Sequence, residues 1–130
     1  MNAAVETDEG VYTIDLETDG VVDFVPGAAL AAQEEPHVEL PLLVAAAAEG
    51  STVVAVLARR PPLAVSHDAG RTWREAGGGL PAGRAIAIAD DDPDRLLYAG
   101  ATRLYVSRDG GRFWRALALE LPEIRRVAWV

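Results

Sequence analysis

The sequence predicts an all-β protein built from four-stranded antiparallel units. Short runs rich in valine, leucine and alanine alternate along the chain with clusters of glycine, proline, aspartate and serine, which is the pattern of strands joined by turns. No stretch has a convincing helical period. In addition, the segment from Ser66 to Trp73 recurs almost letter for letter from Ser107 to Trp114, 41 positions later. A repeat of this length that holds strands rather than helices indicates an array of similar β units.

The composition is that of one soluble globular domain. The chain has 130 residues, of which 50% are hydrophobic and 25% are charged, a balance typical of folded rather than disordered proteins. It contains no cysteine and two histidines, so we expect no disulfide, no metal site and no cofactor. The net charge of -8 argues against nucleic acid as a partner, because phosphates require a basic surface.

The sequence contains no signal for insertion into a membrane or for export. No run of about 18 uncharged apolar residues is present. The first residues also lack a basic stretch followed by an apolar one. We therefore expect a cytoplasmic protein without a membrane partner.

The strands fall into groups separated by turn residues. Gly10 and Gly20 lie in the first two turns, where glycine supplies the positive φ that hairpins need. Residues 26–41 are the least strand-like part of the chain and are expected to form a long loop. We expect strands at residues 2–6, 11–16, 21–25, 42–48, 52–58, 63–66, 73–76, 84–89, 95–100, 103–107, 113–119 and 125–130.

The dipeptide Leu-Pro marks the start of each unit. It occurs at Leu80-Pro81 and Leu121-Pro122, again 41 positions apart, and once more at Leu40-Pro41. The chain therefore contains three first strands, and the last of them lies at the C-terminus. We expect a single domain, residues 1–130, made of three units: residues 2–25 closed by 125–130, residues 42–79, and residues 84–119.

The repeated segment supplies the turn between the third and fourth strands of a unit. In the first unit this turn is altered, although its acidic character remains. Four of its residues, Asp15, Glu17, Asp19 and Val22, stand where the third unit has Ser107, Asp109, Gly111 and Trp114.

The motif S-x-D-x-G-x-[TF]-W resembles the Asp box of the BNR-repeat β-propellers. The resemblance covers residues 40–130 well and residues 1–25 loosely. It implies that the boxes are structural turns that lie away from the binding face of a propeller. The aspartate and serine can bond to turn amides, and a calcium loop is disfavoured because it needs more oxygen ligands. The box residues are Ser66, Asp68, Gly70 and Trp73, and Ser107, Asp109, Gly111 and Trp114.

Three blades do not close a propeller, because closed rings have about four to eight blades. We expect a homodimer that forms a six-bladed ring through its blade faces and terminal strands. Residues 125–130 would complete the blade that begins at residue 2, and the sequence leaves open whether they join their own chain or the partner. The alternative is that the chain is an excised piece of a longer propeller.

Candidate ligand-binding residues lie on the face opposite the boxes. Arg84 and Arg125 occupy matching positions where first strands begin, near the expected mouth of the central channel. The resulting hypothesis is a non-enzymatic binding or scaffold module for an anionic small molecule or glycan, held by arginine forks. The alternative is that these arginines are solvated or paired with the nearby acids Glu34, Glu35, Glu120 and Glu123. The remaining candidates on this rim are Arg59, Arg60, Arg103 and His37.

Two further functions stay open. Sialidases are six-bladed Asp-box propellers that use a tyrosine paired with a glutamate, but Tyr12, Tyr98 and Tyr105 all fall inside expected strands. We therefore assign no catalytic residue. A protein-assembly factor that binds a protein partner is the third possibility, since related propellers include such factors.

Overall fold

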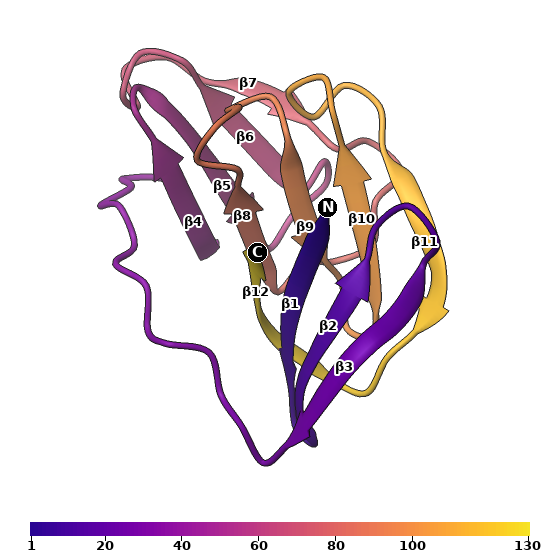
Figure 1. Ribbon diagram of the computed structural model, residues 1–130. Coiled ribbons are helices and arrows are strands. Elements are labelled where there is room, and N and C mark those ends of the chain that lie inside the picture. Colours follow the sequence, from indigo (N-terminus) through magenta and orange to yellow (C-terminus); the bar gives the residue numbers. More distant parts are fainter.

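The computed structural model describes residues 1–130 and is all-β, with twelve strands and no helix (Figure 1). No helix long and apolar enough to cross a membrane is therefore present. The strands form three separate four-stranded antiparallel sheets, as the repeat predicts. They are β1 (Asn2–Thr7), β2 (Gly10–Asp15), β3 (Gly20–Pro26), β4 (Leu43–Glu49), β5 (Thr52–Leu57), β6 (Leu63–Ser66), β7 (Arg74–Ala76), β8 (Ala85–Ile88), β9 (Leu96–Ala99), β10 (Arg103–Ser107), β11 (Arg115–Glu120) and β12 (Ile124–Trp129).

The expected strands are all present, and most of their ends shift by one or two residues. The strand predicted to begin at Phe113 begins at Arg115, because the preceding residues belong to the turn. There the Phe113 N–H donates to Asp109 and the Trp114 indole N–H donates to the Gly111 carbonyl. The hydrogen bonds of Phe113 and Trp114 thus hold these two residues in the turn, although the sequence pattern alone assigns them to the strand.

The chain closes its first sheet with its last strand. The order in this sheet is β12-β1-β2-β3, and β12 pairs antiparallel with β1 of the same chain, with Val127 opposite Val5 and Trp129 opposite Ala3. The Val130 N–H extends this pairing by donating to the Asn2 carbonyl at 3.0 Å. The other two sheets have the orders β4-β5-β6-β7 and β8-β9-β10-β11. In each sheet the strand that comes after a Leu-Pro dipeptide lies at one edge.

The three sheets stand side by side, with the β8–β11 sheet in the middle. Strand β8 contacts both β12 and β4, so the three edge strands form a row (Figure 1). One apolar cluster fills the space between the first sheet and the middle sheet, around Leu104, Leu117 and Ile124. A second cluster, around Leu96 and Tyr98, fills the space between the middle sheet and β4–β7. Complete burial of each such leucine contributes about 1.5–3 kcal/mol, so the two clusters dominate the stability of the row.

The long connection from β3 to β4, residues 27–42, has no strand or helix, in agreement with the sequence prediction. We call it the strap. Its Leu30 N–H donates to the Glu6 carboxylate at 2.8 Å, on the first sheet. Farther along, Val38 and Leu40 pack with Trp73 on a small buried cluster of the β4–β7 sheet. The strap therefore links the two outer sheets across the side that the middle sheet leaves open (Figure 1).

Candidate functional site

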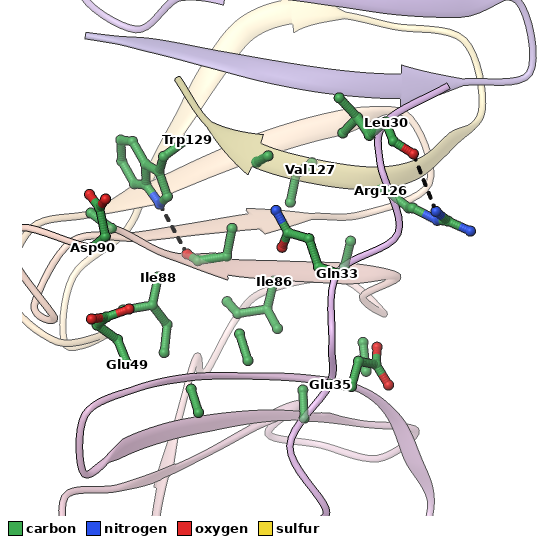
Figure 2. Close-up of a pocket in the computed structure, with 18 of the residues that line it drawn as sticks. Leu30, Gln33, Glu35, Glu49, Ile86, Ile88, Asp90, Arg126, Val127 and Trp129 are labelled. Atoms are coloured by element: carbon green, nitrogen blue, oxygen red, sulfur yellow. Dashed lines mark hydrogen bonds between the residues drawn. The ribbon is translucent and has the colours of Figure 1, made fainter. Parts of the chain in front are cut away.

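A large cavity lies along the row of edge strands. It has a volume of about 1110 Å³ and is walled by β4, β8 and β12. Residues 30–35 of the strap cross its remaining side, and Figure 2 shows Gln33 and Glu35 on this segment, opposite Ile86 of β8. We call it the central cavity.

Small side chains create this space. The three edge strands are rich in alanine where they line the cavity, with Ala45 to Ala48 on β4 and Ala85 and Ala87 on β8. A methyl side chain lets neighbouring backbones converge and still leaves open volume between them. The floor that the strands form is consequently apolar. Polar groups lie at the two ends and on the strap, where Gln33, Glu34 and Glu35 line the cavity.

The two ends of the central cavity carry opposite charge. Arg84, Arg125 and Arg126 lie where β8 and β12 begin, whereas Glu49 and Asp90 lie where β4 and β8 end. Figure 2 shows Asp90 and Glu49 at one end and Arg126 toward the other, with Glu35 of the strap on the same side as Arg126. At about 3.3 Å per residue, the six steps from Arg84 to Asp90 correspond to about 20 Å. This exceeds the screening length of about 8 Å at physiological salt, so the ends act as separate electrostatic environments.

The arginine end is only partly neutralised. Arg84 is paired with Glu123, although both side chains are about half exposed, at 45% and 54%, and an exposed pair of this kind is weak. Arg126 donates a long hydrogen bond of 3.5 Å to the Leu30 carbonyl of the strap. Arg125 makes no hydrogen bond or ion pair. Neither Arg125 nor Arg126 is therefore paired with a carboxylate, although Glu34 and Glu35 of the strap line the same cavity.

The acidic end is braced by side chains that the sequence analysis did not single out. The Trp129 indole N–H donates to the Ala87 carbonyl at 3.1 Å, which ties β12 to β8 (Figure 2). The Arg95 guanidinium lies 5.7 Å from the Trp129 ring centre and bonds to Asp91 at 2.7 Å. That hydrogen bond lowers the pKa of Asp91 below its ordinary value. The alignment of the Leu-Pro dipeptides placed Trp129 on a first strand, and from this its position beside the cavity could have been inferred.

The six predicted binding residues do not form one group. Arg84 and Arg125 both line the central cavity. Arg59 instead pairs with Glu75 at 2.6 Å, and His37 pairs with Glu39 at 3.4 Å on the exposed strap. Two others are placed elsewhere: Arg60 lines a second cavity, and Arg103 lines neither.

The second cavity has a volume of about 570 Å³ and shares no residue with the central cavity. It lies between the β5–β6 connection, the β7–β8 connection and β10. No acidic side chain lines it. Its residues are Arg60, Pro61, Pro62, Gly78, Gly79, Leu80, Pro81 and Tyr105.

The turns 66–73 and 107–114 each contain the same pattern of hydrogen bonds. In the second of them, the buried Ser107 hydroxyl donates to Asp109 at 2.9 Å and accepts the Gly111 N–H at 2.9 Å. Asp109 in turn accepts the Phe113 N–H at 3.0 Å. This last bond is the main reason why the pKa of Asp109 lies below its ordinary value.

The turn at 66–73 repeats these bonds with a further one. Ser66 donates to Asp68 at 2.7 Å and accepts the Gly70 N–H at 2.8 Å. Asp68 also accepts the Thr72 hydroxyl at 2.6 Å and the Thr72 N–H at 2.9 Å, which together hold the pKa of Asp68 well below its usual range. The Asp68 and Asp109 carboxylates thus accept hydrogen bonds from within their own turns. The structure contains no group of three or more acidic or histidine side chains placed to hold a metal ion.

The altered turn at 15–22 uses its acid differently. Asp19 accepts the Arg115 guanidinium at 2.9 Å and the Ala118 N–H at 3.0 Å, both on β11 of the middle sheet. The Ala118 N–H first and Arg115 second lower the pKa of Asp19. Arg74, 41 positions before Arg115, likewise reaches the next sheet and donates to the Gly110 carbonyl at 2.6 Å. Each arginine that follows a motif tryptophan therefore ties its sheet to a neighbouring turn.

None of the three tyrosines lines the central cavity. Tyr98 is buried, donates its hydroxyl to the Pro81 carbonyl at 2.6 Å, and has its pKa raised to about 12 by that burial. Tyr12 packs against Phe24 in the first sheet. A tyrosine and glutamate pair is therefore absent from the central cavity.

Comparison with known proteins adds no family assignment. No protein-family model matches the chain, and no curated protein is similar to it at a significant level.

Proposed function

We propose that the chain is half of a six-bladed Asp-box β-propeller and serves as a non-enzymatic binding module whose ligand occupies the central cavity. Three sheets with matching strand orders stand in a row, and their alanine-rich edge strands lie together. In a propeller such strands surround the central channel. The two turns that carry the Asp-box residues lie outside the cavity, as the resemblance implies.

A second copy would complete the ring. Large exposed apolar side chains gather on the outer sheets, with Val21, Val22 and Val25 on β3 and Leu43 on β4. The middle sheet exposes only one such side chain, in its turn. Burying apolar surface contributes about 25 cal/mol per Å². A two-fold dimer would place the first sheet against the β4–β7 sheet of the partner, together with the strap residues Val38 and Leu40 that pack on it, through two identical interfaces.

The proposed ligand is an anionic small molecule or acidic glycan at the arginine end. The observation that carries this proposal is Arg125, which lines the cavity and has no partner. Arg126 lies beside it, and guanidinium groups bind carboxylates through two parallel hydrogen bonds. In a ring, the arginines of both copies would face one channel, while the acidic end would repel the ligand and so orient it.

The test is calorimetric titration with citrate and with N-acetylneuraminic acid. We expect Arg125→Ala to weaken binding about tenfold, because a charge-assisted hydrogen bond contributes about 1.5–3 kcal/mol. Arg103→Ala is the matched control, since this arginine lines neither cavity, and it should bind like the wild type. Equal affinity of the Arg125→Ala and wild-type proteins would overturn the proposed site.

The glycosidase alternative gains no support from the central cavity, because no tyrosine lines it. A protein ligand is the remaining alternative. In that case neither citrate nor the sugar acid would bind, and the proposal of a small anionic ligand would be wrong.

A further inference from the structure

The second cavity collects hydrogen-bond donors that have no acceptor. The Arg60 guanidinium, the N–H groups of Gly78 and Gly79, and the Tyr105 hydroxyl belong to residues that line it, and none of them donates a hydrogen bond within the chain. No carboxylate lies on its wall. In a protein with a net charge of -8, a cavity with one cation and no acid is an exception that needs a reason.

Residues 77–80 form a tight turn that leaves the N–H groups of its two central glycines without a partner. The Leu80 N–H donates to the Gly77 carbonyl at 3.1 Å, which closes a four-residue turn. Gly79 has a φ of 89°, as the third position of a type II turn requires. The two central N–H groups, of Gly78 and Gly79, donate no hydrogen bond within the chain. A Cβ on Gly77 would lie 3.0 Å from the Leu80 side chain at a φ of 77°, so a side chain there would distort the turn.

A stack of aromatic rings holds the opposite wall in place. The half-buried Tyr105 ring packs edge-on against Tyr98, with 6.0 Å between ring centres. The Tyr98 hydroxyl fixes Pro81 through the bond to its carbonyl. A Cβ on Gly83 would lie only 2.3 Å from that hydroxyl oxygen, so this position requires glycine. The cavity is thus preformed, with Tyr105 and Pro81 positioned by one buried ring.

We propose that this cavity binds a carboxylate that carries an apolar group. Arg60 would grip the carboxylate with its planar fork, assisted by the N–H groups of Gly78 and Gly79. The apolar group would lie against Pro62, Leu80 and the Tyr105 ring. A doubly charged phosphate fits less well, because only one arginine is present and most of the wall is apolar.

Arg60, which lines the second cavity, and Arg103, which does not, provide a matched pair for the test. The full chain is labelled with ¹⁵N and titrated with phenylacetate while the amide signals are followed by NMR. We expect the Gly78 and Gly79 signals to shift in a saturable way. Arg60→Ala should weaken this binding at least about tenfold, whereas Arg103→Ala, which removes an arginine that lines neither cavity, should not. Phenylacetamide, which lacks the charge, should cause no saturable shift.

The source of the carboxylate is settled by a second titration. N-acetyl-glycyl-phenylalanine presents a peptide C-terminus, and its C-terminal amide is the control. Binding of the free acid of the peptide alone identifies a peptide C-terminus, and binding of both acids identifies the carboxylate in general. Equal binding of the amides, unchanged binding by Arg60→Ala, or no saturable shift with either acid up to about 10 mM would overturn the proposal. Citrate binding at the central cavity should be unaffected by Arg60→Ala, so the two sites can fail separately.

Discussion

The turns at 107–114 and 15–22 occupy the same place in their sheets and use an aspartate in different ways. Asp109 bonds to its own turn and is aided by a buried serine. Asp19, which stands where the third unit has Gly111, bonds to Arg115 and Ala118 of the neighbouring sheet. The first arrangement stabilises a local conformation, whereas the second joins two sheets. Where the repeat loses its serine and tryptophan, Asp15 keeps one local bond by accepting the Glu17 N–H at 2.9 Å, and the acid at Asp19 is used for a contact between sheets.

The largest effect is expected from the buried serine. Ser107→Ala leaves the Gly111 N–H without an acceptor and removes one donor to Asp109, which should lower the free energy of unfolding by about 1–3 kcal/mol. Urea unfolding followed by tryptophan fluorescence measures this loss. Ser51→Ala, at an exposed serine whose hydroxyl makes no hydrogen bond, should change it by less than about 0.5 kcal/mol. If the two variants unfolded alike, the local network would not stabilise the fold.

A smaller effect is expected at Asp19, where two contributions can be separated. Asp19→Gly removes only the contacts with Arg115 and Ala118 and should cost less than about 1 kcal/mol, because the ion pair is partly exposed. Asp19→Ala should cost about 1 kcal/mol more, since alanine must also hold a left-handed φ of 59°. Combining Asp19→Gly with Arg115→Ala in a double-mutant cycle measures the link between sheets. A coupling energy of zero would show that this link does not stabilise the row.

The smallest effect on stability is expected at the one position where the matching turns 66–73 and 107–114 differ in backbone strain. Ala69 has a left-handed φ of 60°, at the position where the other turn has Gly110 with a φ of 73°. Ala69→Gly should therefore raise the free energy of unfolding by up to about 1 kcal/mol. The reverse change, Gly110→Ala, should lower it, because the new Cβ would lie 3.2 Å from Asp94. Stabilisation by both variants, or by neither, would contradict this explanation.

Features that depend on local chemistry could be predicted from the sequence. Turn residues mark where strands end, and the recurrence of Ser66 to Trp73 at Ser107 to Trp114 predicted three four-stranded units. The sequence could not decide whether the last strand pairs with β1 of its own chain or of a second copy, because both pairings would use the same residues. The link from Asp19 to Arg115 was missed for a related reason, since it joins residues 96 positions apart.

The candidate sites were predicted only in part. Matching positions brought Arg84 and Arg125 to one cavity end, because equivalent residues of repeated strands face the same way. Arg59 and Arg60 are adjacent in sequence, yet one pairs with Glu75 and the other lines the second cavity. Which of two neighbours faces which side depends on the backbone of the connection, and composition does not reveal this. Tyr105 was likewise placed in a strand without a sign that its ring borders a cavity.

The measurement that tests the central proposal most directly is the mass of the full chain in solution, determined by sedimentation equilibrium. If two half-rings assemble through the outer sheets, the mass should be twice that of one chain at micromolar concentration and should not exceed this value as concentration rises. A single-chain mass at every concentration up to about 100 μM would contradict the six-bladed ring, and the apolar surface of β3 and β4 would then need another explanation.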